Sequence, residues 1–172
     1  MDTKLSFYAE LPVLFFSLIF CDWYTIWAPY LFLWILFLHF SISSDIFIVM
    51  VVNVIILILT STSLKYITWR QWPALSRGLS KHFNLRKAQK NAPSFPSGDC
   101  IQAAHYFMML ALLFHNNWLL LFPLITAYGR VYYCCHWIGD TIAGLVLGAL
   151  LAILAMNFIS QPNFLSQYLN SI

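Results

Sequence analysis

The sequence predicts an all-α polytopic membrane protein in which residues 1–172 form one domain, a bundle of six transmembrane helices. Its composition is 61% hydrophobic and only 9% charged, whereas soluble domains carry about 25% charged residues. Six apolar stretches follow one another along the chain, and a membrane-spanning helix needs about 20 mostly apolar residues, with about 17 as the lower limit. The stretches lie at about residues 5–20, 26–42, 46–64, 101–114, 118–131 and 137–159.

The first three stretches predict antiparallel helices joined by short turns at Asp22 and Asp45. Glu10 and Pro12 interrupt the first stretch, and no small-residue cleavage site follows it. A secretory signal peptide normally has an uninterrupted apolar region and such a site. We therefore expect an uncleaved first helix.

The longest connection, residues 66–97, separates the third and fourth spans. Connections of this length are usually functional or contain structure of their own. Leu75, Leu79 and Phe83 recur at helical spacing, while Arg77 and Lys81 lie off that stripe. This pattern predicts a short interfacial helix with its charges towards the lipid head groups, and an irregular solvated loop is the alternative.

Positive charge is concentrated beside this connection, since seven of the nine Lys and Arg residues lie between positions 65 and 90. No acidic residue occurs between Asp45 and Asp99. The positive-inside rule would place such a segment in the cytoplasm. An electropositive surface that attracts anionic lipid head groups is the functional alternative. A nucleic-acid partner is not expected, because the basic cluster is short and flanked by membrane spans.

Three ionisable residues lie close together before and within the last apolar stretch. Arg130 precedes His136 by six residues, and Asp140 follows His136 by four. Ionisable groups within a membrane are costly and are functional by default. A carboxylate one helical turn away can accept a hydrogen bond from the imidazole and make its other nitrogen a better nucleophile. The Arg130 guanidinium suits phosphate oxygens, so the cluster predicts phosphoryl chemistry beside a membrane.

The segment before the fourth span contains a turn suited to anions. Pro93 and Pro96 stop any helix, and Ser97 and Gly98 then open the span. Backbone N–H groups at a helix start can bind a phosphate. Two further glycines, Gly144 and Gly148, and the four cysteines are expected to serve packing.

Together these blocks resemble the type 2 phosphatidic acid phosphatase superfamily, membrane lipid phosphatases related to vanadium haloperoxidases. Its three motifs are Lys-x6-Arg-Pro, Pro-Ser-Gly-His and Ser-Arg-x5-His-x3-Asp. The third motif matches at Arg130, His136 and Asp140 with both spacings intact, and Lys65 and Pro73 match the first. The resemblance covers about residues 46–158 and implies a six-helix membrane fold.

The chain departs from these motifs at three positions. Gly129 replaces the serine of the third motif, and Trp72 stands where the first has arginine. Arg70, two residues earlier, is a candidate to supply the missing charge on the substrate. Asp99 replaces the histidine of the second motif, which is the most serious departure.

The resemblance implies a role for each matching position. His136 would attack phosphorus and form a phosphohistidine, oriented by Asp140. The phosphoryl oxygens would be held by Lys65, Arg130, Ser97 and the Gly98 N–H group. Residue 99 would protonate the leaving oxygen and later activate water, which a carboxylic acid can do only while it is protonated. His105 lies six residues further along the helix and is not expected to replace it, and His39, His82 and His115 are expected to be packing or interfacial residues.

We therefore expect a metal-independent and cofactor-independent phosphatase whose substrate is a lipid phosphate or diphosphate within the bilayer. A head-group phosphotransferase, and a pseudoenzyme that binds lipid phosphates without turnover, are the alternatives. With six spans, both termini would lie on the membrane face opposite the site. The family resemblance favours an outward or lumenal site, whereas the basic connection and the thiols favour a cytoplasmic one.

Overall fold

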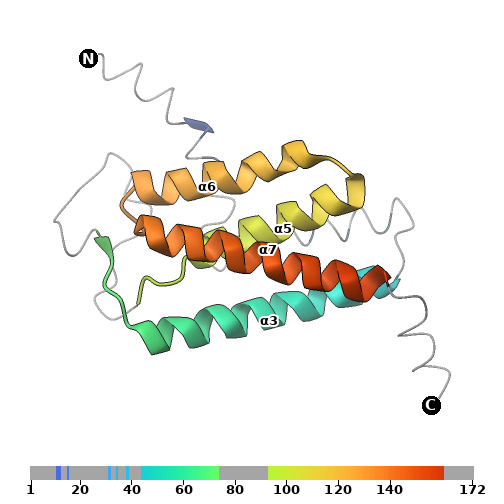
Figure 1. Cartoon of the computed structure of the whole chain (residues 1–172), viewed down its shortest axis with the longest axis horizontal. Helices are drawn as coiled ribbons and strands as arrows, with labels where there is room; N and C mark the ends of the chain where they lie inside the picture. Colours follow the sequence, from blue (N-terminus) through green and yellow to red (C-terminus); the bar gives the residue numbers. More distant parts are fainter. Residues whose placement is uncertain are drawn as a thin grey trace.

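The computed structural model describes residues 44–73 and 93–160, together with six helical positions nearer the N-terminus: Leu11, Pro12, Phe15, Leu31, Trp34 and Leu38. The two long described segments are helical, so the all-α prediction is confirmed for them (Figure 1). The first two predicted spans lie almost entirely outside the described residues, as does the predicted interfacial helix, and the six-span count stays a prediction. The described helices are α3 Ser44–Thr68, α5 Gly98–Phe114, the 3-10 helix η1 Asn117–Leu120, α6 Leu121–Tyr132 and α7 Ile138–Ser160.

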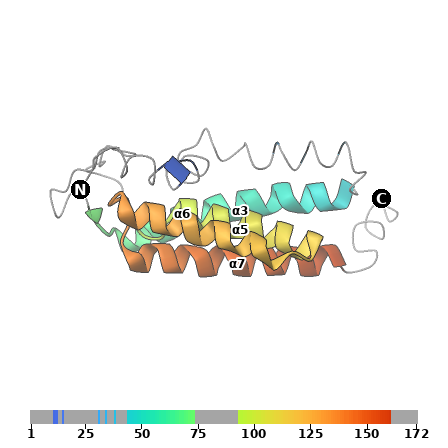
Figure 2. The same cartoon turned by 90° about the horizontal axis from the view of Figure 1, so that it is seen from above.

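These helices lie side by side in an elongated bundle, in which successive elements run in opposite directions (Figures 1 and 2). The most extensive contact is between α5 and α7, and α3 and α6 each pack against this pair. Consequently α3 and α6 end where α5 and α7 begin. This end of the bundle, on the left in Figure 1, collects every segment that carries a predicted site residue.

Two glycines of α7 allow α5 to approach closely. A Cβ atom on Gly144 would lie 2.7 Å from the Ser97 carbonyl oxygen, and one on Gly148 would collide with the Ile101 carbonyl oxygen. The packing role predicted for both glycines is therefore confirmed. Because of this approach, the Ser97 N–H group donates a 3.0 Å hydrogen bond to the Asp140 carbonyl oxygen. The start of α5 is thus fixed against the first turn of α7.

The outer surface of the bundle is apolar, as expected of a surface that contacts the hydrocarbon chains of lipids. Five side chains at four-residue spacing along α7 are each more than half exposed: Ile138, Ile142, Val146, Leu150 and Leu154. Its 23 residues, at about 1.5 Å per residue, make α7 roughly 34 Å long, enough for a hydrocarbon core of about 30 Å. Within the described residues, two helical segments are long and apolar enough to cross a membrane, Val51–Thr68 and Ile138–Phe158. The shorter α5, with 17 residues, is also apolar.

Candidate functional site

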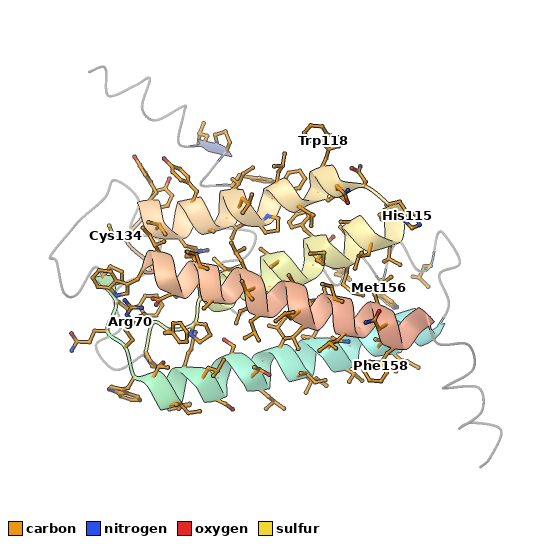
Figure 3. All side chains as sticks on the ribbon, viewed as in Figure 1. Arg70, His115, Trp118, Cys134, Met156 and Phe158 are labelled. Atoms are coloured by element: carbon orange, nitrogen blue, oxygen red, sulfur yellow. The ribbon has the colours of Figure 1, made fainter. Side chains whose placement is uncertain are left out.

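The ionisable site residues lie at helix ends that favour their charges. Asp99 and Asp140 are in the first turns of α5 and α7, whereas Lys65 and Arg130 are in the last turns of α3 and α6. Helix N-termini carry partial positive charge and C-termini partial negative charge, so each placement is favourable. Figure 3 labels Arg70 at this same end, far from His115 and Trp118. The sequence prediction that these residues converge is consistent with the fold.

His136 lies buried between two carboxylates, with 1% of its surface exposed. Its Nδ1 atom is 3.8 Å from Asp140 Oδ2, and its Nε2 atom is 3.8 Å from Asp99 Oδ2. Both distances exceed the hydrogen-bond range of about 2.7–3.2 Å. The carboxylate expected to orient the imidazole therefore lies on the correct side of the ring, about 0.6 Å beyond that range.

Each of these carboxylates is paired with an arginine. Arg130 Nε is 3.2 Å from Asp99 Oδ2, and both side chains are buried. Arg70 Nη1 donates a 2.8 Å hydrogen bond to Asp140 Oδ1, and the Arg70 side chain is 46% exposed. The second oxygen of Asp140 accepts a 3.1 Å hydrogen bond from the Trp137 backbone N–H group. Pairing offsets part of the large cost of burying these charges.

The α5 N-terminus adds backbone donors to the site, and a third cation, Lys65 of α3, lies beside it. Ser97 is the N-cap, and its hydroxyl oxygen accepts a 3.4 Å hydrogen bond from the Cys100 N–H group. Gly98 opens the helix beside α3, where a Cβ atom at position 98 would lie 3.7 Å from Lys65 Nζ. The Lys65 ammonium group therefore lies beside the helix start that the sequence predicts as an anion site.

A network of hydrogen bonds fixes the segment that follows α3. The Ser94 N–H group donates to the Arg70 carbonyl oxygen at 2.7 Å, and the Ser94 hydroxyl donates to the Gln71 carbonyl oxygen at 3.2 Å. The Trp137 indole also donates to the Gln71 carbonyl oxygen, at 2.9 Å. Sequence reasoning assigned no role to Ser94 or Trp137. Their partners lie 23 and 66 residues away along the chain, and no local pattern predicts such contacts.

Trp72 stands where the first motif has arginine, and its ring contacts the His136 imidazole. Its side chain is 5% exposed, and its ring centroid lies 4.7 Å from that of His136. Tyr133 and Cys135 pack against it. Trp72 therefore covers one face of the imidazole where the first motif would supply a charge.

A cavity of about 310 Å³ lies beside the imidazole. Its wall includes His136, Arg70 and Trp137, together with the apolar side chains of Pro73 and Ile138. Lys65, Asp99 and Arg130 are not among the residues that line it. The cavity thus lies on the Arg70 side of His136, apart from the Arg130 side. His105 is fully buried within α5, two turns beyond Asp99.

The described geometry defines a class of protein: an apolar helical bundle with a buried histidine between two acid–arginine pairs at one end. The chain belongs to the PAP2 superfamily, whose family model matches residues 46–164. This membership confirms the resemblance carried by the three motifs. The match begins at the third predicted span and includes α7.

A solved structure supports the fold. The crystal structure of a transmembrane PAP2-type phosphatidylglycerolphosphate phosphatase from Bacillus subtilis matches with a TM-score of 0.72. The match covers 92% of this chain and 80% of that chain at 18% sequence identity. A search of curated proteins found no match. The structural likeness therefore establishes the shared transmembrane PAP2 fold.

Proposed function

We propose that the protein hydrolyses a lipid phosphate or diphosphate through a covalent phosphohistidine on His136. The observation that carries this proposal is a single buried imidazole with a carboxylate facing each nitrogen. Lys65, Arg130 and the α5 N-terminus converge on the same end of the bundle. Membership in a superfamily of membrane lipid phosphatases supports the same reaction.

The first step is attack on phosphorus by the lone pair of His136 Nε2. A nitrogen–phosphorus bond forms, the phosphorus–oxygen bond to the lipid breaks, and the leaving oxygen takes a proton from a general acid. Arg130 and Lys65 stabilise the negative charge that develops on the phosphoryl oxygens, together with the amides at the α5 start. Asp140 faces Nδ1 at 3.8 Å and stabilises the positive charge that the imidazole acquires.

The second step is hydrolysis of the phosphohistidine. Water attacks phosphorus on the side that the lipid oxygen has left, and the nitrogen–phosphorus bond breaks. Inorganic phosphate leaves, and His136 regains its lone pair. The base that accepts the proton of water is the group that donated a proton in the first step, so the cycle restores both protonation states.

Asp99 can act as that acid and base only after it moves. In-line transfer places the acid beyond the leaving oxygen, on the opposite side of phosphorus from the nucleophile. The nucleophile-to-phosphorus distance of about 3–3.5 Å, the ester bond and the acid's hydrogen bond sum to roughly 7 Å. Asp99 Oδ2 lies 3.8 Å from His136 Nε2, which leaves no space for a phosphoryl group between them. Substrate binding must therefore displace this carboxylate from Arg130.

The contact between Asp99 and Arg130 favours a second candidate function, lipid-phosphate binding without turnover. The Asp99 carboxylate is paired with the guanidinium that would hold a phosphoryl oxygen, with 3.2 Å between Asp99 Oδ2 and Arg130 Nε. Trp72 also removes one cation from the first motif. A protein in which Asp99 yields Arg130 to a lipid phosphate but delivers no proton to the leaving oxygen would be a binder built on a phosphatase fold.

Phosphate release by purified protein in detergent, without added metal, tests the first candidate. The panel contains phosphatidic acid, phosphatidylglycerolphosphate and a polyprenyl diphosphate. We expect release from at least one lipid, inhibition by orthovanadate as a transition-state mimic, and no effect of EDTA. His136→Ala should abolish release without loss of the folded protein. Wild-type activity in that variant would exclude the phosphohistidine.

Substitutions at Asp99 decide between the two candidates. If Asp99 is the general acid, Asp99→Asn should remove most activity on a lipid alcohol ester and much less on a nitrophenyl ester, whose leaving group departs without a proton. If the protein is a binder, the wild type should be inert on every lipid while Asp99→His gains turnover. Equal loss on both ester types would exclude Asp99 as the acid.

A further inference from the structure

Arg70 contacts the carboxylate behind the nucleophile. Its Nη1 atom lies 2.8 Å from Asp140 Oδ1, and Asp140 Oδ2 faces His136 Nδ1 at 3.8 Å. Arg130, by contrast, pairs with the carboxylate that faces Nε2. The imidazole ring therefore lies between two carboxylates, that of Asp140, paired with Arg70, and that of Asp99, paired with Arg130. Since attack on phosphorus uses Nε2, Arg70 lies on the side of the ring away from the reacting bond.

The Arg70 guanidinium is held in this position by several contacts. Its Cζ atom lies 5.3 Å from the centre of the Trp137 ring, within the range of a cation–π interaction. The same indole donates a hydrogen bond to the carbonyl oxygen of Gln71, and Ser94 donates one to that of Arg70. The backbone at 70–71 is thus fixed to both α7 and the segment before α5. A side chain fixed in this way is pre-organised for one partner.

Position 139 provides the space that this arrangement needs. A Cβ atom at Gly139 would lie 3.6 Å from Arg70 Nη1, in ordinary contact. Glycine at this position, next to Asp140 in sequence, therefore leaves room for the arginine on the first turn of α7.

We propose that Arg70 is a positioning residue for phosphoryl transfer, acting on His136 through Asp140 instead of contacting the substrate phosphate. This inference rests on the proposed function and assigns Arg70 a different task from the phosphate-binding role considered on sequence grounds. Arg70 and the Trp137 N–H group each hold one oxygen of Asp140, so the carboxylate plane is fixed. A fixed carboxylate opposite Nδ1 selects one orientation of the imidazole, as an outer hydrogen-bond partner does for a metal-binding histidine.

The charge of Arg70 also affects where the imidazole proton resides. A cation at Oδ1 disfavours transfer of a proton from His136 Nδ1 to Asp140. Once the phosphoryl group has displaced Asp99 from Nε2, the proton stays on Nδ1, and the lone pair remains on Nε2, where phosphorus is attacked. Removal of Arg70 should therefore reduce the fraction of His136 that is both correctly oriented and nucleophilic, without weakening phosphate binding.

A double-mutant cycle tests this coupling in the full-length protein in detergent. Arg70→Gln should lower kcat about 10-fold to 100-fold with little change in KM, the usual effect of losing such a partner. In an Asp140→Asn background, Arg70→Gln should lower kcat by less than about 2-fold, because both changes remove the same interaction. Arg70→Lys, which retains the charge, should recover part of the loss. If the two substitutions lower kcat by factors that simply multiply in the double variant, or if Arg70→Gln raises only KM, the proposal is overturned.

The matched control is Lys65→Gln, which removes a cation placed on the phosphate side. It should weaken the binding of inorganic phosphate, a ground-state ligand, about 10-fold or more, and its effect on the rate should multiply with that of Asp140→Asn. Arg70→Gln should leave the affinity for inorganic phosphate within about 2-fold of the wild type. A loss of affinity in Arg70→Gln as large as that in Lys65→Gln would identify Arg70 as a phosphate ligand and refute the positioning role.

Nuclear magnetic resonance of ¹⁵N-histidine-labelled protein provides a readout independent of turnover. The His136 ring signals are assigned by their absence in His136→Gln. With inorganic phosphate bound in place of the Asp99 carboxylate, we expect wild type to show a protonated Nδ1 and an unprotonated Nε2, and Arg70→Gln to show a mixture of tautomers. Unchanged His136 signals in Arg70→Gln would overturn the inference. An inert wild type with these spectral changes would refute the proposed hydrolase while supporting the coupling.

Discussion

On the Nε2 side of His136, Asp99 pairs with an arginine that is fully buried, whereas on the Nδ1 side Asp140 pairs with one that is 46% exposed. The two pairs have the same charges and face the same ring at the same distance of 3.8 Å. They differ in which partner matches the superfamily motif. The arginine matches on the Nε2 side, and the carboxylate matches on the Nδ1 side. Arg130 and Asp140 match, whereas Asp99 replaces the motif histidine and Arg70 lies at a position that the motif does not specify.

This difference indicates how the site can tolerate its departures from the motifs. In the proposed mechanism, the Asp99 carboxylate on the Nε2 side competes with substrate for Arg130 and must move during the reaction. On the Nδ1 side, the added guanidinium supports a motif residue and can stay in place. In this proposal, the departure at Asp99 obstructs the phosphoryl position in the described state, while Arg70, at a position that the motif leaves open, strengthens the support behind the nucleophile. The comparison predicts unequal effects when each pair is broken.

Removal of Arg130 should have the largest effect. Arg130→Ala removes one partner of the buried ion pair with Asp99, and such a loss costs about 3–5 kcal/mol. Arg70→Ala should destabilise less, because water can enter the half-exposed position of Arg70 and the buried Asp140 keeps its hydrogen bond from the Trp137 N–H group. Thermal unfolding of both variants in the same detergent measures the difference. Equal losses of stability would contradict the distinction between the two sides.

Removal of Lys65 should reduce the rate with little effect on stability. If the ammonium group stabilises charge that develops on the phosphoryl oxygens, Lys65→Ala should slow phosphate release about 100-fold, or roughly 3 kcal/mol. Tyr66→Phe is the matched control, since the neighbouring Tyr66 side chain is 68% exposed and has no assigned role. A reduction below about 3-fold in Lys65→Ala would place Lys65 outside the reaction site.

The close approach of α5 and α7 should produce the smallest effects. A methyl group at Gly148 meets the Ile101 backbone, so Gly148→Ala should cost about 1–3 kcal/mol through overpacking. Gly139→Ala is the control, because its added atom makes only ordinary contacts and should cost less than about 0.5 kcal/mol. Thermal unfolding of both variants tests this order. A reversed order would show that the α5–α7 contact is not the constraint that fixes the α5 start.

The elements and the composition of the site could be predicted from sequence, because both rest on local patterns. Apolar runs predict the helices, and the spacing of Arg130, His136 and Asp140 predicts that they share one site. The pairing within the site could not be predicted. Arg70 reaches Asp140 across 70 residues of sequence, and the tilted ring of Trp72 contacts that of His136 across 64. Such contacts depend on how α3 and α7 are placed by packing, which local periodicity does not encode.

Identification of the phosphorylated nitrogen of His136 tests the central claim most directly. A phosphate-labelled lipid is mixed with the full-length protein, the reaction is quenched in alkali, and the labelled phosphohistidine is separated into its two isomers. The account predicts label on Nε2 of His136, the nitrogen that faces Asp99 and Arg130, and no label in His136→Ala. Label on Nδ1, or on a residue other than His136, would contradict it.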